Sequence, residues 1–130
     1  MNIPPVPALP SPGVLLFNLP PERERPVRQW LLRHDVTVRT VRPDEQRHSL
    51  GYLTGMPGRT PAAKPDGTPF TDEMLVMSLF PGTLMDEFLA FFRTAGLEPV
   101  ALKAVVTPSN ASWSAVRLHR ELKKEHRTLS

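Results

Sequence analysis

Small polar side chains and one lysine gather in the stretch LKAVVTPSNASW, from Leu102 to Trp113, and could bind an anion. An apolar run that contains Lys103 leads into Thr107, Ser109 and Asn110, and a helical pattern follows. The free N–H groups and the dipole at the start of a helix attract phosphates and carboxylates. The residues of this stretch therefore form the first candidate binding site.

Three further polar side chains, Asn18, Arg42 and Ser78, lie at the ends of other apolar runs. If these runs are parallel strands, their carboxyl ends meet at one edge of the sheet. Ligands of such sheets bind beyond that edge, where the strand order reverses. The predicted ligand-binding residues are Asn18, Arg42, Ser78, Lys103, Thr107, Ser109 and Asn110.

A structural role for the same stretch is the competing interpretation. Ser, Thr and Asn are also the preferred residues of helix caps and turns. On this view Ser109, Asn110 or Ser112 caps the last helix, and Trp113 is buried against the sheet.

The sequence points to no catalytic residue, no metal site and no cofactor. Cysteine is absent, so no disulfide, thiolate zinc site or cysteine nucleophile can form. His119 and His126 are seven residues apart, about 10 Å along a helix, which is too far to hold one ion. The phosphate-loop, dinucleotide-binding, nucleophile-elbow and zincin motifs are all missing.

Four apolar runs provide the elements that must position these residues, and each run ends at a proline. They are Val14 to Leu19, Val36 to Arg42, Met74 to Phe80, and Ala101 to Thr107. Proline cannot donate to a strand ladder and favours extended geometry in its predecessor. The four runs therefore predict four strands.

Helical patterns follow three of these strands. Leu84, Phe88, Phe91, Phe92 and Ala95 form one apolar face, and Gly96 closes that helix. A shorter helix is expected after the first strand, and a last helix is expected over about 113–127. The third strand with its helix matches the first at a constant offset, which indicates a repeated βα unit.

The predicted fold is a small α/β domain with the element order βαβ(α)βαβα. Nearly continuous apolar runs place the first and third strands in the centre of the sheet. We expect a parallel sheet in the order 2-1-3-4 with helices on both faces, because the long second connection suits a crossover. The alternative is an α+β ferredoxin-like antiparallel sheet.

One domain accounts for most of the chain. With 130 residues, 40% of them apolar, the sequence can build a single core. Residues 1–13 are predicted to be a disordered Pro-rich tail, and residues 14–130 the domain. A short helix is expected near residues 46–53, followed by a mobile loop at 54–70.

Charge and hydropathy constrain the partners and the compartment. The net charge is +3 and is unevenly spread: residues 71–100 carry five acids against one base, whereas residues 101–130 carry six bases against two acids. Glutamates interrupt the basic stretch RLHRELKKEHR, and no strand shows interleaved aromatics, so a nucleic-acid partner is disfavoured. No signal sequence or membrane-spanning run is evident, so we expect a cytoplasmic protein that binds a protein partner or a small anionic ligand.

Several segments resemble a known bacterial family, the domain of unknown function 3783. They are LGYLTG, DEMLVM, DEFLAFFRTAG, LKAVVTPSNASW and ELKKEH, and the resemblance spans Val14 to Arg127. The Pro-rich extension before Val14 departs from the family pattern. The resemblance implies a small bacterial protein but supplies no activity.

The sequence therefore favours a non-catalytic binding or regulatory module. The alternative is an enzyme or a binder of phosphate or nucleotide ligands that uses the crevice at the carboxyl edge of the sheet.

Overall fold

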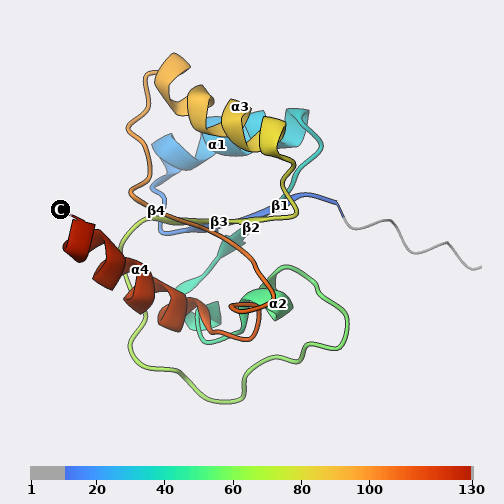
Figure 1. The fold of residues 1–130 in the computed structure, drawn as a ribbon, viewed down its shortest axis with the longest axis vertical. Helices are drawn as coiled ribbons and strands as arrows, with labels where there is room; N and C mark the ends of the chain where they lie inside the picture. The colour runs from blue at the N-terminus through green and yellow to red at the C-terminus, as the bar shows by residue number, and fades with distance from the viewer. Residues whose placement is uncertain (1–10, 130) are drawn as a thin grey trace, which may run out of the picture.

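A computed structural model describes residues 11–129 of the chain, with the side chain of residue 129 left out. The four predicted strands are all present, and four α-helices accompany them (Figure 1). The elements are β1 (Gly13–Phe17), α1 (Pro21–Arg33), β2 (Thr37–Val41), the 3-10 helix η1 (Pro43–Glu45), α2 (Leu50–Leu53), β3 (Met74–Ser78), α3 (Gly82–Thr94), β4 (Leu102–Val105) and α4 (Ala115–Leu129).

The strands form one sheet in the order β2-β1-β3-β4, which confirms the predicted order. The predicted direction of the strands is wrong in the centre of the sheet. β1 runs parallel to β2, and β3 runs parallel to β4, but β1 and β3 are antiparallel. The sheet is therefore mixed, and it is neither all-parallel nor the fully antiparallel sheet of the alternative fold.

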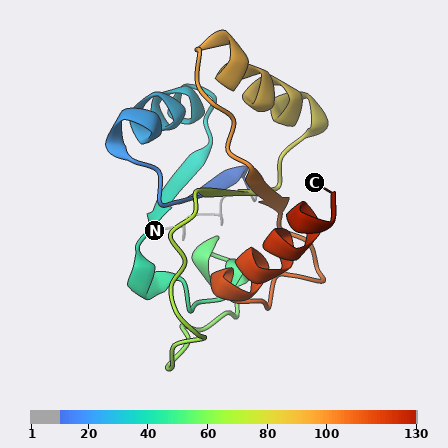
Figure 2. The same cartoon turned by 90° about the vertical axis from the view of Figure 1, so that its left-hand side faces the viewer.

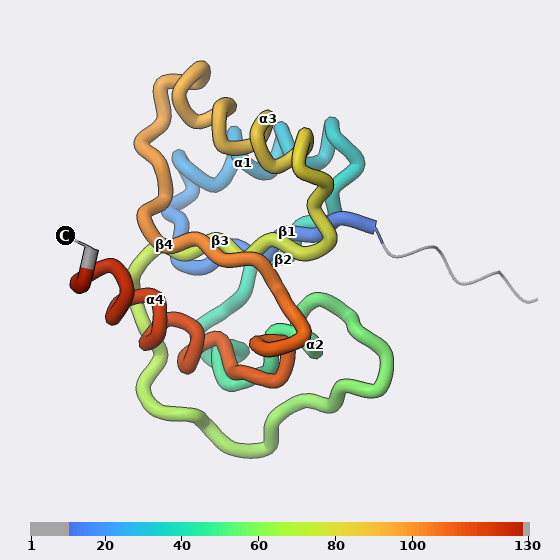
Figure 3. Tube along the Cα trace, viewed as in Figure 1, coloured from blue at the N-terminus to red at the C-terminus, as the bar shows by residue number. Residues whose placement is uncertain are grey.

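The length of the second connection explains the error. Because β1 and β3 are antiparallel, β2 ends at the edge of the sheet where β3 begins. A crossover is therefore unnecessary. The connection between Val41 and Met74 contains α2, and its part after α2 runs below α2 and α4 in the view of Figure 3. Its length serves to cover a face of the sheet.

The repeated unit predicted from the sequence is present as two βαβ units related by an approximate two-fold axis. Leu15 of β1 pairs with Val76 of β3, which lies 61 residues further along the chain (76 − 15). The same offset relates Asn18 to Leu79, and both have a left-handed backbone, with φ of 61° and 59°. Two similar units thus meet along their antiparallel first strands.

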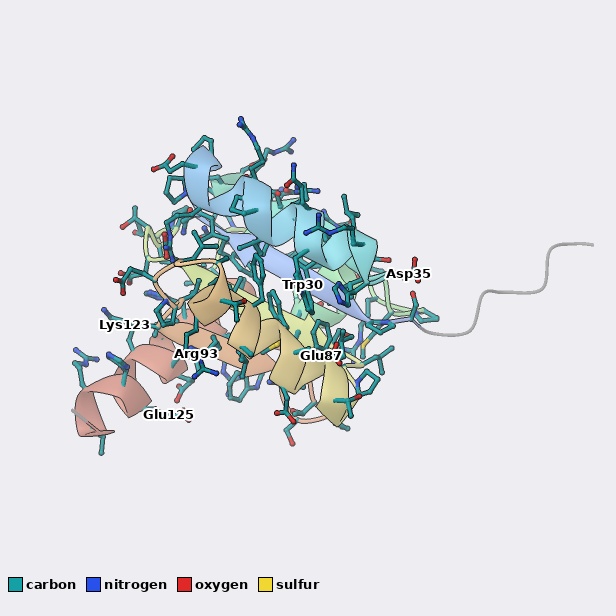
Figure 4. The ribbon with its side chains drawn as sticks, turned by 90° about the horizontal axis from the view of Figure 1, so that it is seen from above. Trp30, Asp35, Glu87, Arg93, Lys123 and Glu125 are labelled. Atoms are coloured by element: carbon teal, nitrogen blue, oxygen red, sulfur yellow. The ribbon has the colours of Figure 1, made fainter. Side chains whose placement is uncertain are left out.

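One face of the sheet packs against α1 and α3 (Figure 2). Side chains of a strand point alternately to its two faces, and Val14 and Leu16 of β1 face this side. Val27 of α1 and Phe88 of α3 are fully buried against them. Trp30 lies in the seam between the two helices, where its ring stacks 5.4 Å from Phe88 (Figure 4).

The opposite face packs against α2, α4 and the long connection. Leu15 and Phe17 of β1 contribute to this second core, together with Leu50 of α2 and Leu118 of α4. Phe70, from the end of the connection, lies with its ring 5.5 Å from that of Phe17. Helices therefore cover both faces, as predicted.

Side chains tie the long connection to the core. Gln46 is fully buried, accepts a hydrogen bond from Phe70 N (2.9 Å) and donates one to Phe70 O (3.3 Å). His48 Nδ1 accepts a hydrogen bond from Ala62 N (2.9 Å), and Ser114 Oγ bonds Asp66. The helix expected near residues 46–53 is shorter in the structure, because α2 begins at Leu50.

The start of the domain also lies earlier than predicted. Gly13, assigned to the tail from the sequence, is the first residue of β1, and Pro12 O accepts a hydrogen bond from Thr37 N (3.0 Å). Residues 1–10 of the predicted tail lie outside the described residues.

Replacing Gln46 with alanine is expected to lower the free energy of unfolding by about 3 kcal/mol, because the change opens a cavity and removes two buried hydrogen bonds. Chemical denaturation measures this loss. Gln29→Ala, at an exposed position of α1, is the control and should change the free energy by less than about 0.5 kcal/mol. Equal effects of the two substitutions would contradict the role given to Gln46.

Candidate functional site

The predicted site residues do not form one crevice. Asn18 and Arg42 follow β1 and β2, at the edge of the sheet where Phe17 pairs with Met74. Ser78 and the residues that follow β4, namely Thr107, Ser109 and Asn110, belong to the opposite edge, where Gly13 pairs with Ser78. Lys103 pairs with Leu75 between the two edges. The antiparallel central pair therefore separates the candidates into two groups.

Asn18 has a structural role at the first edge. Its side-chain amide donates to Phe70 O and to Asp72 O, both at 2.9 Å. Asparagine tolerates the left-handed backbone that this turn adopts. Asn18 therefore fixes the turn after β1 to the end of the long connection.

Arg42 and Lys103 are also engaged within the protein. Arg42 is exposed and donates from Nε to Asp44 Oδ1 at 3.2 Å. Lys103 is half-buried, and its ammonium group donates to Val100 O. The hydrogen bonds described for these two side chains are to residues outside the predicted site.

Asn110 folds the turn after β4. Its Oδ1 accepts from Thr107 N (2.8 Å), and its Nδ2 donates to Val105 O (3.0 Å). Thr107 Oγ1 accepts from Asn110 N in return, at 3.2 Å. Ser109 in this turn is exposed. The amide of Asn110 is thus used to end the edge strand rather than to face a ligand.

The N-terminus of α4 has no free N–H groups in its first turn. Ala115 N donates to His48 O and Val116 N donates to Gln46 O, both at 3.2 Å. Arg117 N donates to Ser114 Oγ at 3.0 Å. The groups expected to bind an anion are therefore already hydrogen-bonded to the protein.

Ser114 is the helix cap that the sequence interpretation missed. Ser109, Asn110 and Ser112 were the expected caps, but α4 begins at Ala115, two to five residues later than those choices require. Trp113 is half-buried rather than buried, and it packs at the side of the core with the Arg117 guanidinium 4.2 Å from its ring centre.

A polar cluster joins α4 to the start of β3. The His119 ring stacks on Phe70 at 4.2 Å, and its Nε2 lies 2.7 Å from Asp72 Oδ2. Lys123 Nζ lies 3.6 Å from the same oxygen. The hydrogen bond from His119 holds the pKa of Asp72 below its ordinary value. This pair links two elements, and no hydroxyl nucleophile is hydrogen-bonded to His119 among residues 11–129.

The largest hollow of those described is a groove of about 750 Å³ at the opposite edge of the sheet. It lies between the sheet and the residues that follow α2. The residues at this edge are small: Gly13 pairs with Ser78 of β3 on one side and with Thr37 of β2 on the other. The lining is Ser11, Gly13, Val14, Thr37, Arg39, Leu53, Thr54, Gly55, Met56, Pro57, Ser78 and Leu79.

The groove lining is mainly apolar, with hydroxyl groups and one charged side chain. Arg39 Nη2 contacts Glu45 Oε2 at 2.7 Å, and its Nη1 donates to Leu53 O at 3.4 Å. The described lining contains no Asp, Glu, His, Lys or Tyr that could transfer a proton. Of the predicted residues only Ser78 lies here, because the groove depends on the pairing of β1 with β3, which no local pattern reveals.

A second hollow of about 200 Å³ lies between η1 and the long connection. Arg47 lines it, and Arg47 Nε is buried without a hydrogen-bond partner among the described residues. Asp44 and Asp66 also line it. Two carboxylates beside one guanidinium do not favour an anion, so the groove remains the candidate site.

Residues 73–129 match the model of a family described as Domain of unknown function (DUF3783). The second half of the chain resembles this family. The match runs from the residue before β3 to the end of α4, and it is shorter than the resemblance over residues 14–127 inferred from the sequence. Neither the search of curated proteins nor the search of solved structures found a significant match.

Within residues 11–129, no helix has the length and apolarity needed to cross a bilayer. The same part of the chain holds no cluster of three or more His, Asp or Glu side chains arranged to bind a metal ion.

Ser114→Ala is expected to lower the free energy of unfolding by about 1 kcal/mol, because it removes the cap of α4. Ser112→Ala, at an exposed neighbour that makes no cap, should change it by less than about 0.5 kcal/mol. Urea unfolding of both variants measures the difference. A larger loss for Ser112→Ala would show that the cap is misassigned.

Stability should also fall with acid through His48. This side chain is 8% exposed, and its Nδ1 must be unprotonated to accept from Ala62 N. Burial, followed by the charge of Arg47, lowers the pKa of His48. A lowered pKa stabilises the fold above the unfolded value of about 6.5, and this contribution is lost as the pH falls through the folded pKa.

The free energy of unfolding, measured from pH 7.5 downward, should therefore begin to decrease below about pH 6.5. His48→Asn keeps an acceptor near Ala62 N but does not titrate, so its decrease should start only when the carboxylates protonate. Identical pH profiles for the two proteins would exclude His48 as the cause.

Proposed function

We propose that this protein is a non-catalytic binding module whose ligand occupies the groove at the Gly13–Ser78 edge of the sheet. The observation that carries the proposal is the combination of size and chemistry in this groove. Its volume of about 750 Å³ falls in the range of small-molecule sites. Its described lining offers apolar surface and hydroxyls but no proton-transfer group.

The hydroxyls of Thr37 and Ser78 can each donate and accept a hydrogen bond, and so can orient a ligand. Without a neighbouring base, however, a serine or threonine hydroxyl is a weak nucleophile. These properties support binding over catalysis.

The alternative, an enzyme or a phosphate or nucleotide binder, has weaker support. Its main support in the sequence is the start of α4 as an anion site. In the structure, however, the N–H groups of Ala115, Val116 and Arg117 donate to acceptors within the protein. The titratable pair His119 and Asp72 lies at the other edge of the sheet and joins α4 to the segment before β3. No comparable cluster lines the groove.

The setting of this module is part of the same proposal. The sequence segments that resemble a bacterial family support a bacterial origin, and the absence of cysteine suits a reducing cytoplasm. A ligand held without chemistry suits a regulatory or carrier role.

Thermal-shift screening of a small-molecule collection that includes nucleotides, phosphorylated metabolites and neutral apolar compounds tests the proposal. A ligand of the folded state raises the melting temperature. Gly13→Leu should fill the groove, since a Cβ at Gly13 meets only Thr37 O, at an ordinary 3.6 Å. We expect the shifts given by hits to fall by at least about two thirds in Gly13→Leu, because the stabilisation by a ligand falls with the logarithm of its affinity.

Gly82→Leu is the matched control, because Gly82 begins α3 and has open space around it, outside the groove lining. It should keep the full shift. Circular dichroism and the melting temperature without ligand establish that both variants fold. Hits that stabilise Gly13→Leu as strongly as the unmodified protein would place the binding site elsewhere and overturn the proposal.

A further inference from the structure

Leu79 combines two unfavourable properties at the rim of the groove. Its side chain is 56% exposed, although it is a large apolar residue. Its backbone is left-handed, with φ of 59°, a conformation that costs a leucine about 1 kcal/mol or more. Residues held in such conformations are concentrated at ligand clamps and other functional sites. Leu79 also belongs to the groove lining.

The equivalent turn in the first βαβ unit shows how this conformation is otherwise accommodated. Asn18 occupies that turn, and asparagine visits the left-handed region more readily than leucine. The cost of the left-handed backbone at Asn18 is also offset by two hydrogen bonds that its side chain donates, to Phe70 O and Asp72 O. Leu79 offers neither the tolerance nor the hydrogen bonds of Asn18, and it presents an apolar surface instead.

The two ends of the β1–β3 strand pair also differ in whether the space beside them is filled. At one end Phe17 pairs with Met74, and the Phe70 ring packs on Phe17. At the other end the pair is Gly13 and Ser78, and the space beside it is the groove. Phe70 thus fills the space beside Phe17 at the first end. The small residues Gly13 and Ser78 leave the corresponding space at the second end open as the groove.

The charges around the groove indicate the kind of molecule that fits it. Arg39 is the one charged side chain among the described lining residues, and it is paired with Glu45 at 2.7 Å. An anionic ligand would have to compete with that carboxylate, whereas an uncharged ligand would leave the pair intact. Complementarity therefore favours a neutral molecule.

We propose, on the basis of the proposed binding function, that the groove takes an uncharged small molecule with an apolar body and one hydrogen-bonding group. Leu79 packs on the apolar body from one side, and the wall formed by Leu53 and Met56 contacts it from the other. The hydroxyls of Thr37 and Ser78 bind the polar group. Leu79 is thereby a binding residue that selects apolar ligands.

Nile red, a neutral apolar dye whose fluorescence rises on leaving water, is the probe for this site. Its dissociation constant is measured for the full chain, for Leu79→Asn and for Leu32→Asn. Asparagine suits the left-handed turn, so Leu79→Asn should fold with an equal or higher melting temperature while binding Nile red at least about tenfold more weakly. Leu32 is equally exposed, at 56%, but lies on α1 outside the groove lining, so Leu32→Asn should bind unchanged.

The anionic dye 8-anilinonaphthalene-1-sulfonate provides the charge comparison and should bind at least about tenfold more weakly than Nile red. Tighter binding of the sulfonate would overturn the neutral-ligand inference. Saturable Nile red binding that is lost in Gly13→Leu but unchanged in Leu79→Asn would overturn the role of Leu79 and leave the proposed function standing. Absence of saturable Nile red binding to the unmodified protein would overturn this inference, whereas the thermal-shift screen with Gly13→Leu decides the proposed function separately.

Discussion

The antiparallel pairing of β1 with β3 determines at which edge of the sheet each strand ends. Each βαβ unit is parallel within itself, as its helical crossover requires. Because the first strands of the two units are antiparallel, the carboxyl ends of β1 and β2 lie at one edge of the sheet. The carboxyl ends of β3 and β4 lie at the other edge. No single edge therefore collects all the strand ends, and a ligand crevice of the parallel type cannot form.

The two edges then differ because their side chains differ. Phe17, Met74 and Phe70 close one end of the sheet face that packs against α2 and α4. Gln46 fixes Phe70 in place through hydrogen bonds to its backbone N–H and C=O. Gly13 and Ser78 leave the other end open. Polar and titratable groups are used to hold the closed end together, whereas the open end retains apolar surface and hydroxyls. The division explains why the described lining of the groove is apolar and hydroxyl-bearing, while the titratable pair His119 and Asp72 lies at the other edge.

Much of the fold could be predicted from the sequence, but little of the candidate site. Strands buried on both faces read as continuous apolar runs, so Val14 to Leu19 and Met74 to Phe80 marked the central strands. Strand direction leaves no such signal, since side chains alternate identically in parallel and antiparallel pairs. The groove arises from the register of Gly13 against Ser78, and the cap Ser114 is one of four nearby candidates, so neither could be identified before the chain was folded.

Mapping backbone amide shifts in two-dimensional ¹H–¹⁵N spectra during titration with indole, a neutral aromatic with one N–H donor, tests the central claim most directly. The account predicts saturable shifts concentrated at Gly13, Thr37, Gly55, Ser78 and Leu79, the residues around the groove. Shifts concentrated instead between Thr107 and Arg117 would contradict it, because they would place binding at the start of α4, where the N–H groups are already occupied.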